Sequence, residues 1–177
     1  MVLAGGLKLK SGYKLYASTQ NAESFNIIAE GLDFHYPSTL PASCFSYRQY
    51  HTVTGFNTAS VANPNLDGSG SGIVSIYQAG NGAGLMGSHI TSVTIKALQS
   101  TNDNGMIRLF IYDGSDYHLF REVCIPQTTQ SAFEPSFKVV LPMDLNIEAG
   151  YQLFATTQLA QSFAITVEGA DWSYAIS

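Results

Sequence analysis

The stretch Leu145-Asn-Ile-Glu-Ala-Gly-Tyr-Gln-Leu-Phe-Ala-Thr-Thr-Gln-Leu-Ala-Gln-Ser-Phe-Ala-Ile-Thr-Val-Glu-Gly-Ala-Asp-Trp-Ser-Tyr174 repeats an earlier part of the chain without a gap. The earlier copy reads Leu7-Lys-Leu-Lys-Ser-Gly-Tyr-Lys-Leu-Tyr-Ala-Ser-Thr-Gln-Asn-Ala-Glu-Ser-Phe-Asn-Ile-Ile-Ala-Glu-Gly-Leu-Asp-Phe-His-Tyr36. Half of the aligned positions are identical, at one constant offset. Chance similarity rarely keeps register for this long, so the two stretches form an internal repeat.

The identities in this repeat follow the side-chain period of a β-strand. They fall first on every second residue and then continue in the second half: Tyr13/Tyr151, Leu15/Leu153, Ala17/Ala155, Thr19/Thr157, Phe25/Phe163 and Ile27/Ile165. Alternate side chains of a strand share one face. Each copy is therefore predicted to be a β-hairpin with one buried face and a short polar turn. Gly31 and Gly169, which follow the matched Glu of each copy, are predicted to lie at a bulge or at positive φ.

The rest of the chain reads as short strands separated by turns. The predicted strands are 73–77, 90–98, 106–112, 117–125 and 136–141, followed by the second repeat copy. Asn104-Gly105 predicts a hairpin turn between two of them. No stretch has sustained apolar spacing of the helical kind, and turn signals recur about every 8 to 12 residues. The pattern predicts an all-β chain, namely an antiparallel β-sandwich of jelly-roll type with an N-terminal β-hairpin extension.

Three parts of the chain follow from this pattern. Residues 1–36 form the N-terminal hairpin arm, and residues 51–177 form the β-sandwich domain. Residues 37–50 form a linker, because Pro37 and Pro41 favour extended backbone. The aromatic-rich stretch 44–56 leaves two interpretations open, a strand or an extended arm that lies on a surface.

The first repeat copy lacks the strands that would cover its apolar face. A lone hairpin is marginally stable in water, which leaves three explanations. It docks on the domain of its own chain, it crosses to a neighbouring subunit and extends a sheet there, or it remains from a tandem two-domain ancestor. We expect docking within an oligomer. The predicted interface residues are Leu15, Ala17, Phe25, Ile27, Phe45, Tyr47 and Tyr50.

The composition favours contact with protein or sugar surfaces over the surface of a metabolic enzyme. Only 12% of the residues are charged, against roughly 25% in a typical soluble domain. The net charge is −5 and no basic tract is present, which argues against nucleic acid as a partner. No apolar run approaches the roughly 18 residues of a membrane span, and the N-terminus lacks the pattern of a signal peptide. Cys44 and Cys124 are interpreted as buried or half-buried thiols, although a disulfide stays open.

Residues with catalytic, metal-binding or cofactor-binding potential do not form a motif in this sequence. The four histidines, His35, His51, His89 and His118, are not spaced with one another or with carboxylates as a metal site requires. The Asp-Gly-Ser segments at 67–69 and 113–115 lack the ligands of a calcium loop and are predicted to be turns. The sequence therefore predicts no catalytic residue, no metal and no cofactor.

Several aromatic residues offer faces on which a sugar ring can stack. They are Tyr112, Tyr117, Trp172 and Tyr174, of which Tyr117 and Trp172 are the candidates for glycan stacking. A place in the core or at an interface is the other interpretation of the same residues.

Five segments from Leu66 onward carry a resemblance to a known family. They are Leu66-Asp-Gly-Ser-Gly70, Gly105-Met-Ile-Arg-Leu-Phe-Ile-Tyr-Asp-Gly114, Leu119-Phe-Arg-Glu-Val123, and the repeat segments Gly150-Tyr-Gln-Leu-Phe-Ala-Thr-Thr-Gln158 and Ser162-Phe-Ala-Ile-Thr-Val-Glu-Gly-Ala-Asp171. In these segments the chain resembles a family of small β-rich virion proteins of bacteriophages and prophages. The resemblance covers about two thirds of the chain and consists of strands and turns. It implies a jelly-roll that decorates or cements a capsid, or a tail or fibre component.

Two functional hypotheses follow. The first is a non-enzymatic phage virion protein, assembled in the host cytoplasm and located in the virion. Its partners are copies of itself, as a trimer, and the major capsid protein or other virion proteins, with no nucleic acid and no membrane. The second is a carbohydrate-binding or receptor-binding module of a phage tail or fibre, which requires an exposed aromatic platform with Asp and Asn nearby.

Overall fold

The computed structural model describes residues 14–19, 27–29 and 46–176, with side chains throughout except at 46–53 and 174–176. It contains eight strands among the described residues. Their bounds are β1 Ser46–Ala59, β2 Val74–Gln78, β3 Gly87–Ala97, β4 Gly105–Tyr112, β5 Tyr117–Ile125, β6 Lys138–Glu148, β7 Gln152–Thr157 and β8 Phe163–Ile176.

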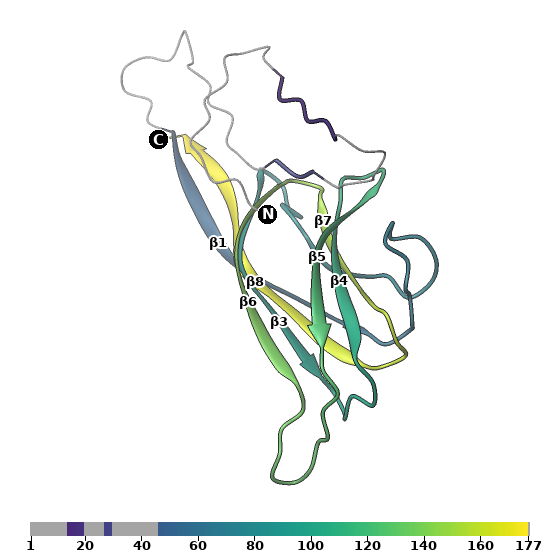
Figure 1. The fold of residues 1–177 in the computed structure, drawn as a ribbon. Helices are drawn as coiled ribbons and strands as arrows, with labels where there is room; N and C mark the ends of the chain where they lie inside the picture. Colours follow the sequence, from purple (N-terminus) through teal and green to yellow (C-terminus); the bar gives the residue numbers. More distant parts are fainter. Residues whose placement is uncertain (1–13, 20–26, 30–45, 177) are drawn as a thin grey trace.

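The strands form two four-stranded sheets, β1-β8-β3-β6 and β2-β7-β4-β5, which lie against each other as two layers (Figure 1). All strand pairs within them are antiparallel. The chain changes sheet at every connection except the one between β4 and β5. Eight strands in this order are a jelly-roll sandwich, and the predicted all-β antiparallel sandwich of jelly-roll type is confirmed. The predicted N-terminal hairpin extension lies largely outside the described residues and stays a prediction.

The core between the sheets is built by the alternation visible in the sequence. Val93 and Ile95 of β3 and Ile165 and Val167 of β8 are fully buried, and the residues between them face outward. On the other sheet, β4 contributes Leu109 and its neighbours two positions away, and β7 contributes Leu153 and Ala155. β7 lies between β2 and β4, and β8 lies between β1 and β3, so the second repeat copy supplies a central strand to each sheet.

The second repeat copy is not a hairpin, and that prediction is wrong. β7 and β8 belong to opposite sheets, and the connection between them bonds to a different strand at each end. The Gln158 N–H donates to the Met106 carbonyl at 2.8 Å, whereas the Ser162 carbonyl accepts from the Leu98 N–H at 2.9 Å. Both sheets bury their inner faces in one core, so alternation looks the same for strands that pair and for strands that face each other.

The predicted hairpin at Asn104-Gly105 is wrong for the same reason, since strands that face each other show the same alternation as strands that pair. The strands on either side of it, β3 and β4, lie in different sheets. The predicted strands 136–141 and 145 onward are also one element, because β6 runs unbroken as Lys138–Glu148. Pro142 lies inside this strand, which is tolerated because β6 is at a sheet edge.

The two Asp-Gly-Ser turns are confirmed. The Asp113 Oδ1 atom accepts from the N–H groups of Ser115 and Asp116 at 2.8 and 2.9 Å. Asp67 Oδ1 accepts from the Ser69 N–H at 2.9 Å in the same way. The glycine after each Asp has positive φ, 71° at Gly68 and 101° at Gly114, which only glycine adopts without strain.

Gly169 lies at a bulge, which is one of the two alternatives predicted for it, because its partner Ile90 borders a register shift between β3 and β8. Its φ is not among the positive values of the described glycines. The register shift lies on the partner strand β3, between Ile90 and Ser92. A Cβ atom on Gly169 would overlap the His89 carbonyl oxygen and come within 2.9 Å of Ile90 Cα. The residue is glycine because two backbones approach closely here.

The boundary between linker and domain lies earlier in the chain than predicted. β1 begins at Ser46 and pairs with β8 along its whole length, so residues 46–50 belong to the sandwich and not to the linker. The strand interpretation therefore holds for the part of the aromatic-rich stretch that is described, 46–56. The described residues of the N-terminal arm, 14–19 and 27–29, lie outside the eight strands. The rest of the predicted arm lies outside the described residues, and its docking stays a prediction.

Candidate interaction surface

The outer faces of the two sheets differ in what covers them. On sheet β2-β7-β4-β5 the outward Phe110 of β4 is fully buried although it is not part of the inter-sheet core. It belongs to an aromatic cluster with Tyr112, Tyr117 and Phe154, whose neighbouring ring centroids are 4.6 to 6.5 Å apart. This face is closed by the protein itself.

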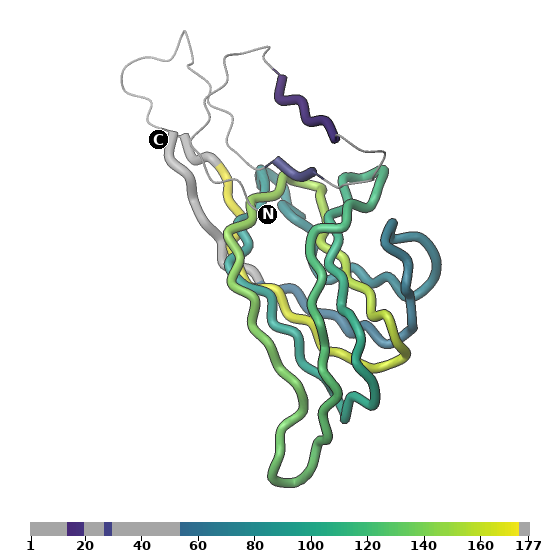
Figure 2. Tube along the Cα trace, in the orientation of Figure 1, coloured from purple at the N-terminus to yellow at the C-terminus, as the bar shows by residue number. Residues whose placement is uncertain are grey.

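Loop 60–73 helps to close that face. A Cβ atom on Gly68 would lie 2.5 Å from the Cβ of Tyr117, so the loop backbone rests directly on the aromatic cluster. The Asn63 N–H donates to the Thr157 carbonyl at 2.7 Å, and the Asn63 Nδ2 atom donates to the Ser69 carbonyl at 2.9 Å. Figure 2 shows the loop in blue beside the sheet that contains β4 and β7.

The outer face of sheet β1-β8-β3-β6 carries no such cover among the described residues. Register places its outward side chains in three rows across all four strands: Thr58, Ala164, Lys96 and Lys138; Phe56, Thr166, Thr94 and Val140; and Thr54, Glu168, Ser92 and Pro142. We call these twelve residues the open face. In its central row, Phe56 is 79% exposed and Val140 is 52% exposed.

Uncharged side chains make up nine of the twelve residues of the open face. Its only charged members are Glu168, Lys96 and Lys138. Glu168 accepts a hydrogen bond from the Ser92 hydroxyl at 3.2 Å. Lys96 and Lys138 lie directly opposite each other in the ladder, and neither has an ion pair with a described residue. Two like charges at one edge favour a partner that offers a carboxylate there.

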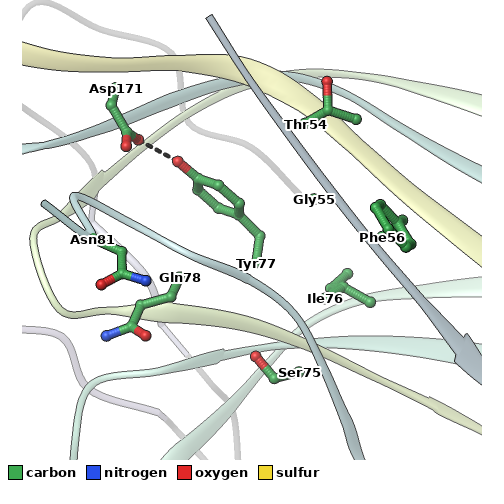
Figure 3. Close-up of a pocket in the computed structure, with 9 residues that line it drawn as sticks. All are labelled: Thr54, Gly55, Phe56, Ser75, Ile76, Tyr77, Gln78, Asn81 and Asp171. Carbon is green, nitrogen blue, oxygen red and sulfur yellow. Dashed lines mark hydrogen bonds between the residues drawn. The ribbon is translucent and has the colours of Figure 1, made fainter. Parts of the chain in front are cut away.

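A shallow hollow of about 500 Å³ lies at the side of the open face, where β1 passes over β2. Figure 3 shows Phe56 and Thr54 on one side of it and Tyr77, Gln78, Asn81 and Asp171 on the other. β1 and β2 are very close at this point, because a Cβ atom on Gly55 would overlap the Ile76 carbonyl oxygen. The hollow is therefore lined by one exposed aromatic ring, two amides and one carboxylate.

The carboxylate in this hollow is held by a buried hydroxyl pair. The hydroxyls of Tyr77 and Ser88 both donate to Asp171 Oδ1 (Figure 3 shows the Tyr77 bond), and the two hydroxyl oxygens are 3.0 Å apart. Burial and the bond to Asp171 raise the pKa of the Tyr77 phenol well above its usual range. The phenol stays protonated and works as a donor. This arrangement fixes β2, β3 and β8 to one another.

A second cavity, of about 170 Å³, lies between described residues of the N-terminal arm and the domain. It is lined by Ile27 and Ile28 on one side and by Ile111, Asp113, His118 and Tyr151 on the other. The His118 Nε2 atom lies 2.9 Å from Asp113 Oδ2. Backbone hydrogen bonds of the turn and the bond to His118 lower the pKa of Asp113 well below its usual range. Within the described residues, this cavity places part of the arm beside its own domain.

The predicted interface residues fall into three groups. Leu15, Ala17 and Ile27 are exposed, with Leu15 at 62% and Ile27 at 64%. Tyr47 and Tyr50 lie in β1, opposite Ala175 and Trp172 of β8. Phe25 and Phe45 lie outside the described residues. Their role at an interface stays a prediction.

The two predicted glycan-stacking residues are half-buried and lie apart. Tyr117 belongs to the aromatic cluster beneath loop 60–73. Trp172 packs on Gly87, whose Cβ atom would lie 3.0 Å from the ring atom Cζ2. Neither ring presents a fully exposed platform, and stacking on them stays a prediction.

Cys124 is exposed, whereas the sequence was interpreted as giving it a buried or half-buried thiol.

Sequence reasoning missed the open face and the Asp171 cluster. Phe56 lies in the aromatic-rich stretch 44–56, for which the sequence leaves a strand and an extended arm open. Its place between Gly55 and two polar neighbours, in a strand whose alternate residues are Thr54 and Thr58, is the signal that could have identified an outward aromatic. The partners of Asp171 come from β2 and β3, which no spacing in the sequence brings together.

Neither a metal-binding group nor a membrane-spanning helix is found among the described residues. No group of three His, Cys, Asp or Glu residues there is placed to hold a metal ion. No helix in that part of the chain has the length and apolar character to cross a membrane.

Comparison with known proteins gives a structural match and no sequence match. A scan against protein-family models and a search of curated proteins both give none. Among solved structures, the chain matches a chain in the structure of the infectious bursal disease virus Gt strain, with a TM-score of 0.30 and 14% sequence identity. The match covers 84% of this chain and 41% of that chain, so this chain spans less than half of the neighbour's length. At this score and identity the match carries no argument about function.

Proposed function

We propose that this chain is a non-enzymatic structural protein of a phage virion that decorates or cements the capsid through subunit contacts. The observation that carries the proposal is the open face, a sheet surface without cover among the described residues, with Phe56 and Val140 exposed in its central row. The resemblance of the sequence to small phage virion proteins supports the same function.

The chemistry of the open face suits a permanent protein contact. Alanine, valine and proline side chains carry no polar group to desolvate, and Phe56 offers the kind of aromatic anchor that contributes strongly at interfaces. Stable contacts bury about 1,600 Å² in total, or roughly 800 Å² on each partner. The charged pair Lys96 and Lys138 at the β6 edge selects a partner with acidic groups at the rim.

The proposed partners are the major capsid protein, or another virion protein, and further copies of this chain. A homotrimer places three open faces on one shell, so that each weak contact is strengthened by the other two. Light scattering tests the trimer, because it predicts a particle three times the 19.1 kDa of the chain. The protein acts in the virion and is assembled in the host cytoplasm.

The test of this function is retention on particles. Virions are assembled with the wild-type chain, with Phe56→Asp or Val140→Asp, or with the control Leu66→Asp, which alters an equally exposed residue in loop 60–73. Quantitative mass spectrometry of purified particles then counts copies per particle. We expect the open-face variants to be reduced about tenfold or more, equivalent to about 1.4 kcal/mol or more of contact energy, and Leu66→Asp to be retained.

Two results would count against the proposal. If the wild-type chain is absent from purified particles, the virion function is wrong. If Leu66→Asp is lost from particles as strongly as Phe56→Asp, the open face is not the contact surface. Thermal unfolding of each variant serves as the folding control, because all three positions are exposed and their replacement should leave the melting temperature unchanged.

A carbohydrate-binding function is the second candidate, and the hollow beside Phe56 favours it. An exposed ring with Gln78, Asn81 and Asp171 nearby is the combination of stacking face and polar groups that a sugar requires. Glycan-array binding that is lost in Phe56→Ala and kept in Tyr117→Ala would favour this hollow. The opposite order would favour Tyr117, and no binding by the wild type would remove the candidate.

A further inference from the structure

The connection between β5 and β6 projects beyond the ends of the other strands (Figure 1). Both of its sides are fixed to the end of β3 and the residues that follow it. On the outgoing side, the Gln130 N–H donates to the Ser100 hydroxyl at 2.9 Å. On the returning side, the Ser136 hydroxyl donates to the Ala97 carbonyl at 2.6 Å. Residues 131–135, which we call the loop tip, therefore lie between two fixed points.

The loop tip is a closed turn that presents a phenyl ring to solvent. The Ser131 N–H donates to the Glu134 carbonyl at 3.0 Å, and the Ser131 hydroxyl accepts from the N–H groups of Phe133 and Glu134 at 3.2 and 3.1 Å. Phe133 is 96% exposed, the highest value of any large hydrophobic residue that the structure describes. A ring on a pre-organised turn gives up little conformational freedom on binding, which makes it an efficient anchor.

A surface of complementary character lies at the root of the same connection. Lys96 of β3 and Lys138 of β6 are opposite each other in the ladder, both are exposed, and neither has an ion pair with a described residue. Leu98, which follows β3 directly, is 50% exposed. We call these three residues the lysine patch. Two like charges placed opposite each other are unfavourable until a carboxylate joins them.

The loop tip and the lysine patch of one chain do not meet in the structure. Glu134 precedes Lys138 by only four residues, yet the two side chains form no ion pair. The bond from Ser136 to Ala97 fixes the chain between them, and the tip points away from the sheets (Figure 1). The complement of each surface therefore has to come from another molecule, and a second copy of this chain carries both.

We propose that the loop tip of one copy docks on the lysine patch of another. Phe133 packs on the neighbouring copy's Leu98, and Glu134 pairs with its two lysines. Tip and patch are different surfaces, so such head-to-tail contacts close into a ring in which each copy gives one tip and receives one. The inference deepens the proposed function by locating the contact between copies, and it rests on that function for copies being partners.

Charge reversal in the purified full chain tests the contact. Sedimentation velocity over a concentration series measures the association constant, starting from the 19.1 kDa of one chain. We expect Phe133→Ala and Glu134→Lys each to weaken association about tenfold or more. Lys96→Glu combined with Lys138→Glu should have the same effect. The triple variant with Glu134→Lys, Lys96→Glu and Lys138→Glu reverses tip and patch together and should regain most of the wild-type constant.

The matched control is Glu148→Lys, which makes the same charge change at the other end of β6 and should associate like the wild type. Melting temperatures serve as the folding control, because every substituted residue is exposed.

Three results would overturn the proposal. If the wild-type chain stays at 19.1 kDa at every concentration, copies do not meet through this contact. If Glu134→Lys associates like the wild type, the loop tip is not the contact. If the triple variant is as weak as Glu134→Lys alone, the tip does not dock on the lysine patch. The measurement contains no particles, so its failure is distinguishable from a failure of the retention test with Phe56→Asp.

Discussion

Asp171 is the buried residue with the most specific surroundings in this domain. It lies in β8, is 5% exposed, and accepts the hydroxyl groups of Tyr77 from β2 and Ser88 from β3. A buried carboxylate is stable only when its oxygens are hydrogen-bonded. The cluster therefore links three strands that belong to both sheets.

Tyr77→Phe is expected to lower the free energy of unfolding by about 1.5–3 kcal/mol at neutral pH, because a buried carboxylate loses a donor. The pKa of Tyr77 is raised in the folded state from its ordinary value of 10.0. A raised pKa stabilises the fold below the unfolded value, and this contribution is lost as the pH rises through the folded value. Urea unfolding between pH 7 and pH 11 should show a decline above pH 10 in the wild type. The same decline in Tyr77→Phe would contradict the assignment.

Gly169→Ala should destabilise the domain by about 1–3 kcal/mol, since the new Cβ atom overlaps the backbone of β3 and the two strands must separate. The chain offers a matched control, because Gly31 holds the same position in the first repeat copy. Gly31→Ala should leave the melting temperature unchanged. Equal melting temperatures for Gly169→Ala and the wild type would show that the close approach is not required.

Single elements show what the sequence can and cannot predict. The strand positions were predicted well, with β5 at its observed bounds and β4 within one residue, because alternation reports one buried face. The assignment of strands to sheets was not predicted. β7 with β8 and β3 with β4 look like hairpins in the sequence, because facing sheets share one core and leave the same pattern. The turn predicted at 113–115 joins two strands that do pair, β4 and β5, because so short a connection leaves the chain no room to cross to the other sheet.

Loop 60–73 is the element that makes the two outer faces different. Asn63 holds it by a backbone bond to Thr157 and by side-chain bonds to Ser69 and Asn65. Asn63→Ala should free the loop and uncover the aromatic cluster at Tyr117, at a cost of about 1–3 kcal/mol. Limited proteolysis should then cut first between residues 60 and 73. Leu66→Ala, which alters an exposed residue of the same loop, is the control. Equal cleavage of wild type and Asn63→Ala would contradict this role.

The part of the molecule that the structure describes is a sandwich with one closed face and one open face. The low charge of the sequence does not single out this face, because three of its twelve residues, Lys96, Lys138 and Glu168, are charged against 12% of the whole chain. The open face itself could not be read from the sequence, because its rows join four strands that are far apart in the chain. Phe56 and Val140 become neighbours in one row only through β8 and β3.

The central claim is that the open face is the surface by which this protein attaches to a virion. The most direct measurement is a cryo-EM map of the native particle into which the domain is fitted. The account predicts that Phe56 and Val140 lie against a neighbouring subunit and that loop 60–73 faces solvent. A map in which loop 60–73 makes the contact and the open face is exposed to solvent would contradict it.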